Sequence, residues 1–254
     1  MDGLLAGFDL QAWLTFVPIV AFAAVIYSAV GFGAGIVAVP IATQFYDLRF
    51  TIAVLAIVEL VNSIRLVLSQ RGEIVVSEAR VLIVTSILGT GLGMALLVIM
   101  PTRWLMIALA LFIVAYLLSL RLNGPGQVRA AQGWAYPAGF VAGVCSAMFG
   151  AGGPPYAIYL RMRQLGMAKF RATMGMVGMF NLSSRVIGFT VLGLYFAPRT
   201  LITGLALLPV SILATLITER FRNRVPVGLL TRLTSIILAL AAVSLIWRAV
   251  QLPG

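Results

Sequence analysis

The sequence contains no histidine, a single cysteine and few charged residues. Of its 254 residues, 10% are charged and 61% are hydrophobic, whereas a soluble domain has roughly 25% charged and 45–50% apolar residues. Without histidine there is no His-ligated haem, no HExxH zinc site and no His-based catalytic triad. One cysteine, Cys145, permits neither an intramolecular disulfide nor a thiolate cluster. The composition therefore argues against a soluble protein and predicts no metal site and no cofactor.

Apolar runs follow one another along the whole chain, and the mean hydropathy is +1.08. Runs of about 20 apolar residues are typical of helical membrane proteins. We therefore expect an all-α polytopic membrane protein with no soluble domain. Eight of its apolar segments are long enough to cross a bilayer alone, and two are short. The ten segments are 12–30, 36–46, 50–69, 80–100, 103–121, 134–149, 154–164, 170–196, 199–218 and 226–249.

The net charge of +11 comes from 17 arginines and one lysine, most of them in short loops between apolar segments. Basic residues in such loops orient helices by the positive-inside rule, so we attribute the charge to topology and not to nucleic-acid binding. The first basic residue is Arg49, and Asp2 and Asp9 precede it. Because a cleavable signal peptide begins with a basic region, none is expected here.

The two halves of the chain resemble each other. The triplet at 33–35 recurs at 150–152, and the triplet at 86–88 recurs at 211–213. Three single residues, Asn62, Arg65 and Pro101, have counterparts in Asn181, Arg185 and Pro226. A duplicated architecture of this kind is typical of transporters. We expect a first transmembrane repeat at 1–121, a linker at 122–133 and a second repeat at 134–254.

The positive-inside rule distinguishes two arrangements of these repeats. If each short segment completes a crossing with its neighbour, each half makes five crossings and the repeats are inverted. Eleven basic residues then lie inside (Arg71, Arg80, Arg121, Arg129, Arg161, Arg163, Lys169, Arg171, Arg220, Arg222 and Arg224) and four outside (Arg49, Arg103, Arg199 and Arg248). If the short segments do not cross, the repeats are parallel, with nine basic residues inside and six outside. The rule favours inverted repeats of five segments, with both termini outside, by a modest margin.

Both short segments follow glycine-rich breaks, GFGAG at 31–35 and GAGGPP at 150–155. Non-helical backbone at membrane depth is tolerated only where it is buried in protein or lines a cavity. Half-helices that begin at these breaks would present free N–H groups and positive dipole ends, which bind anions. We expect Gly33, Gly35, Gly152 and Gly153 to let the backbone approach a ligand closely. Close helix packing through small residues is the alternative.

Polar side chains follow each break on one face of the next long segment. Asn62 and Arg65 lie in segment 50–69, and Asn181, Ser184 and Arg185 lie in segment 170–196. A charged group at the bilayer centre costs about 2.5–3.5 kcal/mol on insertion scales, so a compensating partner is expected. A guanidinium offers five donors in a fixed fork that suits oxyanions. We expect these residues to bind substrate. The alternatives are an interhelical ion pair and, for Arg65, snorkelling to the surface.

Glu59 precedes Asn62 on the same face and has two interpretations. As a proton-coupling group it would change its protonation during transport, and as a structural counter-ion to an arginine it would stay ionised. The second half has no acid at the matching position, where Gly178 or Met179 stands. The sequence leaves both interpretations open.

The two broken segments resemble a known family. SAVGFGAGIVAVPIA at 28–42 and GVCSAMFGAGGPPYAIYL at 143–160 are similar to the paired glycine-rich motifs of the TauE/SafE family of membrane transporters. The resemblance covers essentially the whole chain, although the first copy reads GFGAG where the family often has a denser GxGGG. It implies export of sulfite or small organosulfonates such as sulfoacetate, mostly at bacterial plasma membranes.

Residues and resemblance together predict a secondary transporter that moves a small anion by alternating access. The residues alone indicate a small anion at the midplane, and only the resemblance indicates sulfur. An anion channel and a transporter of another small organic anion are the alternatives. An enzyme is less favoured, because the helices hold no acid/base pair and no nucleophile–base pair. The expected partners are the anion and the lipid bilayer, and the oligomeric state is open, a homodimer being one option.

Overall fold

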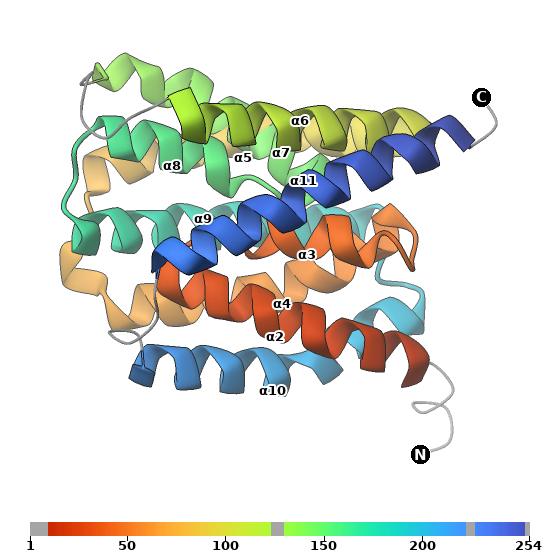
Figure 1. Cartoon of the computed structure of the whole chain (residues 1–254). Coiled ribbons are helices and arrows are strands. Elements are labelled where there is room, and N and C mark those ends of the chain that lie inside the picture. The colour runs from red at the N-terminus through yellow and green to blue at the C-terminus, as the bar shows by residue number, and fades with distance from the viewer. Residues whose placement is uncertain (1–9, 123–129, 222–226, 252–254) are drawn as a thin grey trace.

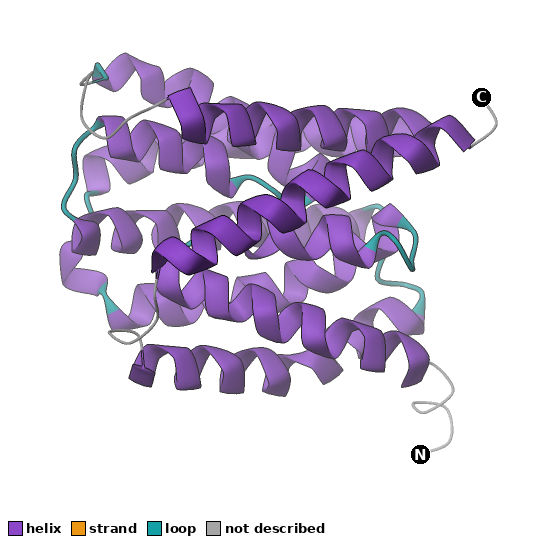
Figure 2. Ribbon diagram, in the orientation of Figure 1, coloured by secondary structure: helices purple, strands orange, loops and turns teal. Residues whose placement is uncertain are grey.

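The computed structural model describes residues 10–122, 130–221 and 227–251, and within these ranges every regular element is helical (Figures 1 and 2). Two of these elements are single 3₁₀ turns, Arg71–Glu73 and Gln132–Trp134. The α-helices are α2 (Leu10–Val30), α3 (Ala34–Ala42), α4 (Leu48–Ser69), α5 (Val76–Ile99), α6 (Thr102–Leu122), α7 (Ala135–Phe149), α8 (Gly153–Met162), α9 (Met167–Val191), α10 (Pro198–Phe221) and α11 (Val227–Gln251).

Six helices of the described ranges are long and apolar enough to cross a membrane: α2, α4, α5, α6, α10 and α11. Two of the eight segments expected to be long enough to cross a bilayer alone, those of α7 and α9, are not among these six. Helix α7 has 15 residues, about 22 Å at 1.5 Å per residue, which is shorter than a hydrocarbon core of about 30 Å. Helix α9 has 25 residues, but its glycines and serines, together with Asn181 and Arg185, reduce its hydropathy.

The glycine-rich breaks separate α2 from α3 and α7 from α8. Gly33 caps the start of α3 with φ 98° and Gly150 caps the end of α7 with φ 66°, a left-handed conformation that glycine adopts at little cost. Pro154 lies in the first turn of α8, where its missing N–H leaves no intrahelical bond unmade. The break between α7 and α8 lies in the interior of the bundle, about midway along the neighbouring helices (Figure 2). Both short helices predicted from the sequence are therefore present.

Helices of the first half pack mainly on helices of the second half. Helix α5 packs along α7 and α2 along α10, while α4 packs along α9 and α6 along α11. If α2–α6 are matched in order to α7–α11, α7 is the counterpart of α2 and α10 is the counterpart of α5. The α5–α7 pair is therefore equivalent to the α10–α2 pair. In the α4–α9 and α6–α11 pairs, each helix packs on its own counterpart. The buried core thus forms between the halves, and neither half encloses it alone.

The tightest pair, α5 and α7, is joined through small residues. A Cβ built on Gly89 of α5 would overlap the carbonyl oxygen of Phe140, and one on Gly143 of α7 would overlap that of Ser86. Gly93 and Gly139 extend the same contact, because a Cβ on either would come within 2.9 Å of backbone or side-chain atoms of the other helix. Close backbone approach through small residues is a common way to join helices in membranes.

Apart from the buried Arg185, most basic side chains of the described residues lie at two opposite ends of the bundle. At one end, Arg65 of α4 approaches Glu219 of α10, and the α4–α5 and α8–α9 turns line a common cavity. The residues at this end include Arg71, Arg80, Arg161, Arg163, Lys169, Arg171 and Arg220. Of the other basic residues predicted there, Arg129, Arg222 and Arg224 lie outside the described residues, as do residues 123–129 of the predicted linker. We call this the basic end.

At the opposite end the arginines cap helices and cover aromatic rings. Arg49 donates hydrogen bonds to the last carbonyls of α5, and Arg248 donates to the carbonyl of Thr43. The guanidinium of Arg199 lies 4.9 Å from the ring centroid of Phe50. The first turn of α2 and the last turn of α11 also lie at this end (Figure 1).

Candidate functional site

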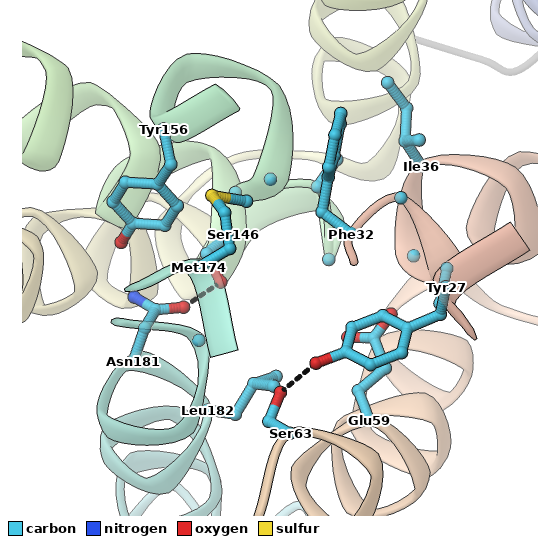
Figure 3. A pocket seen from close by; sticks show the side chains of 18 of the residues that line it. Tyr27, Phe32, Ile36, Glu59, Ser63, Ser146, Tyr156, Met174, Asn181 and Leu182 are labelled. Carbon is cyan, nitrogen blue, oxygen red and sulfur yellow. Dashed lines mark hydrogen bonds between the residues drawn. The ribbon is translucent and has the colours of Figure 1, made fainter. Parts of the chain in front are cut away.

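The two glycine-rich breaks enclose a central cavity of about 60 Å³. The first turns of α3 and α8 line it, together with side chains from α2, α4, α7, α8 and α9. Figure 3 shows how side chains from both halves of the chain converge on it. The described part of the chain therefore brings the two breaks together around one cavity.

The breaks touch each other directly. A Cβ built on Gly35 would overlap the carbonyl oxygen of Gly150 and would lie 2.7 Å from Oε1 of Glu59. A Cβ on Gly153 would lie 2.9 Å from Cδ2 of Phe32 and 3.5 Å from the backbone nitrogen of Gly33. A side chain at either glycine would therefore push the two half-helices apart.

The N-terminus of α3 provides backbone donors at the cavity. Ala34, Gly35 and Ile36 line it, and no described side chain caps the start of α3 or of α8. The first N–H groups of a helix have no intrahelical partner and attract anions. In α8 the corresponding positions include Pro154 and Pro155, which have no N–H. The two half-helices are thus unequal as anion binders, and α3 is the better one.

Arg185 of α9 is the cation of the site, and its side chain is only 1% exposed. Its Nη1 lies 3.5 Å from Oε2 of Glu59 and 3.5 Å from Oγ of Ser146. Its Nη2 donates to the carbonyl of Ile52 at 3.3 Å. Among the described residues Nε of Arg185 has no hydrogen-bond partner. The guanidinium thus keeps donor capacity at a place where an unpaired buried donor is costly.

Glu59 of α4 lies against both Arg185 and the first break. The 3.5 Å distance between its Oε2 and Nη1 of Arg185 fits the interpretation of Glu59 as a counter-ion to an arginine. Proton coupling stays a prediction. The contact of Oε1 with Gly35 puts the carboxylate at the positive end of α3. A substrate anion at that helix terminus would therefore meet Glu59 as a competitor for the same donors.

Asn181 of α9 belongs to the wall of the cavity. The Ser146 hydroxyl donates to its Oδ1 (Figure 3), and its Nδ2 donates to Thr90 Oγ1 at 2.9 Å. These bonds connect α9 to α7 and α5. Both ends of the Asn181 amide are thus engaged within the protein, and Ser146 lies between Asn181 and Arg185.

Three of the predicted ligands do not line the central cavity. Asn62 donates to Ser211 Oγ at 2.7 Å and so connects α4 to α10, as Asn181 connects α9 to α5. Arg65 approaches Glu219 of α10 at 3.5 Å, an ion pair between two helices and not a place in the cavity wall. The Ser184 hydroxyl donates to the carbonyl of Asn181 in its own helix. The assignment of these three as ligands stays a prediction, and they are not part of the site proposed below.

The chain also matches a known family over most of its length. A family model for the sulfite exporter TauE/SafE matches residues 16–245. The chain belongs to the TauE/SafE family. Neither a curated protein nor a solved structure matches it. Membership and the apolar helices together make this TauE/SafE protein a multi-pass membrane transporter, of a family that exports sulfite.

Several side chains outside the predicted ligand set complete the site of this TauE/SafE protein. Tyr27 of α2 bonds Ser63 of α4 at 2.9 Å (Figure 3), and both line the central cavity with Ser146 and Tyr156. One signal was available. Tyr27 and Ser146 stand four residues before the first glycine of their breaks, Gly31 and Gly150, and each accepts the backbone hydrogen bond of that glycine. Polar residues one turn before a helix break therefore point toward it.

A buried polar cluster outside the central cavity was not predicted from the sequence. Glu78 of α5 accepts hydrogen bonds from Tyr159 of α8 and from Arg163 at 2.7 Å. Arg163 also donates to the carbonyl of Ala130 at 2.9 Å. These bonds attach the end of α8 to α5. The cluster therefore stabilises the packing of the basic end.

Proposed function

We propose that this TauE/SafE protein exports sulfite or a small organosulfonate by alternating access, with the central cavity as its substrate site. The observation that carries this proposal is the joining of the two half-helix starts beside Arg185. This juxtaposition combines backbone donors, positive dipole ends and a buried guanidinium, which is the chemistry of an oxyanion site.

The size of the cavity favours a compact anion. A water molecule needs about 10–15 Å³ of such volume, so 60 Å³ corresponds to roughly four to six water-sized positions. A sulfite ion, with one sulfur and three oxygens, matches this space. A sulfonate such as sulfoacetate is larger and requires the half-helices to separate further. We therefore expect sulfite to bind more tightly than larger sulfonates.

In the proposed mechanism the anion accepts hydrogen bonds from the N–H groups of α3. It also replaces Glu59 as an acceptor of hydrogen bonds from Arg185. Protonation of Glu59 would weaken its hold on the guanidinium, and this is how a proton could be coupled to substrate binding. Coupling is not required for export. A potential of about 100 mV, negative inside, favours expulsion of a monoanion by roughly 2.3 kcal/mol.

We also propose that the two halves, 1–121 and 134–254 with their linker at 122–133, are inverted repeats that rock about this site. The matched pairing of helices between the halves supports this, as does the position of Arg49 and Arg103 at the end opposite Arg71. The excess of basic residues then makes the basic end cytoplasmic, with both termini outside a bacterial plasma membrane. To test it, an Arg103→Cys variant in a Cys145→Ser background would be labelled in intact cells with an impermeant reagent. Labelling only after permeabilisation would overturn this orientation.

The experiment that tests the function is anion flux in proteoliposomes, with sulfite, sulfoacetate, taurine, sulfate and chloride compared. Saturable flux of sulfite, with sulfoacetate weaker, is the expected result. Flux that rises linearly with concentration would indicate an anion channel, and flux of another anion alone would change the substrate. Without flux of any of these anions, the proposed function would be wrong.

A further inference from the structure

A second cavity, of about 710 Å³, opens at the basic end of the bundle. It lies between the α4–α5 turn and the α8–α9 turn. Three of its lining residues are cations and one is an acid: Arg71, Arg161, Arg171 and Glu73. Its size exceeds that of the central cavity many times, and its charge favours anions. We call it the basic vestibule.

Arg171 of α9 joins the basic vestibule to the central cavity. Its side chain lines the vestibule although the residue is only 5% exposed, and its Nη2 donates to the carbonyl of Ser28 at 2.8 Å. Its Cγ lies 3.1 Å from the position of a Cβ on Gly31, and Gly31 lines the central cavity. The stem of one buried arginine therefore extends from one space to the other.

Phe32 of the first break lies between the two spaces. Its ring lines the central cavity and is 6% exposed. The Phe32 ring also packs against Phe170, in a T-shaped arrangement with 6.2 Å between ring centroids, and its centroid lies 5.9 Å from the guanidinium of Arg161. Phe170 and Arg161 both line the vestibule. The Phe32 ring therefore contacts lining residues of both spaces.

We propose that the basic vestibule is a second binding site for the transported oxyanion, from which the anion reaches the central cavity past the Phe32 ring. This inference rests on the proposed function, because it assigns the vestibule to the same substrate. Guanidinium groups in a water-filled recess attract anions over a screening length of about 8–10 Å. A vestibule of this kind raises the local concentration of the anion at the mouth of its site. The phosphate of an anionic lipid headgroup has the same chemistry, so the test separates the two sources.

The test measures the concentration dependence of sulfite flux in vesicles of phosphatidylcholine, with and without phosphatidylglycerol. The Arg71→Gln/Arg161→Gln double variant removes two exposed vestibule charges. Arg80→Gln, an exposed arginine at the same end that does not line the vestibule, is the matched control. We expect a rise of about fivefold in KM for the double variant with kcat unchanged, and no rise for the control. Because the effect is electrostatic, it should shrink at high ionic strength.

The outcomes separate the two proposals. Without flux in the wild type, the proposed function itself is wrong. With saturable wild-type flux and the same KM in the double variant, only the vestibule site is wrong. A rise in KM that appears only with phosphatidylglycerol would assign the vestibule to lipid headgroups and would also overturn the inference.

The role of Phe32 has a separate test that does not depend on transport. A Ser146→Cys variant in a Cys145→Ser background places one thiol in the central cavity. We expect a small thiol reagent applied from the basic end to label it at least about tenfold faster when Phe32→Ala is added. Phe45→Ala, an exposed aromatic at the opposite end, is the control and should leave the rate unchanged. Equal labelling rates with and without the Phe32 ring would contradict its role as a barrier.

Discussion

Replacement of Arg185 and Glu59, singly and together, distinguishes a substrate-binding guanidinium from a purely structural ion pair. Their charged atoms lie 3.5 Å apart, and both residues are buried. Removal of one partner leaves an uncompensated buried charge, which costs about 3–5 kcal/mol. We therefore expect both Arg185→Gln and Glu59→Gln to unfold at clearly lower temperatures than the wild type. Thermal unfolding of the purified proteins in detergent measures this.

The double variant Arg185→Gln/Glu59→Gln replaces the ion pair by two neutral amides. No uncompensated charge then stays buried, which is the main cost in each single variant, so we expect most of the lost unfolding temperature to return. Transport should not return. A charge-assisted hydrogen bond is worth about 1.5–3 kcal/mol, so two bonds from Arg185 to the anion amount to about 3–6 kcal/mol. At about 1.4 kcal/mol per tenfold change, KM for sulfite should rise at least about 100-fold.

Arg65→Gln is the matched control for this experiment. Arg65 is the counterpart of Arg185 in the first half, but it approaches the half-exposed Glu219 and does not line the central cavity. A half-exposed ion pair is worth at most about 1 kcal/mol, and KM for sulfite should stay within about twofold of the wild type. A stable double variant that transports sulfite with the wild-type KM would refute the assignment of Arg185 to the substrate.

Two further substitutions test the site from the backbone and from its wall. Gly35→Ala should abolish sulfite flux and lower stability by about 1–3 kcal/mol, because its methyl group would overlap the other half-helix. In the control Gly91→Ala the added methyl group has nothing within 4 Å, so flux should be unchanged and stability should not fall. Normal flux through Gly35→Ala would contradict the close approach. Asn62→Ala should cost about 1–3 kcal/mol in unfolding free energy, because it removes the partner of Ser211, with KM for sulfite unchanged. A tenfold rise in KM without loss of stability would instead make Asn62 a ligand.

The sequence by itself determined the helices and the two breaks. Apolar runs, two glycine-rich interruptions and Pro154 are local signals, because each reports what the backbone can do within a few residues. Arg185 was recognisable as a buried cation because it is far from both ends of its helix. The segment predicted around Arg185, 170–196, differs from α9 (Met167–Val191) by a few residues at each end. At its C-terminal end the helix stops before Gly193, which has a positive φ.

Only the tertiary structure decided which polar residues share the central cavity. Asn62, Arg65, Asn181 and Arg185 stand at matching places in the two repeats, but only the latter two reach the cavity. The choice depends on which helix packs against each face: α10 covers Asn62 and Arg65, whereas α5 and α7 meet Asn181. The bonds of Asn62 to α10 and of Asn181 to α5 join residues from opposite halves of the chain, and hydropathy and periodicity carry no information about them. The substrate site therefore forms only where the two halves pack together, whereas the helices and breaks that build it are specified within each half.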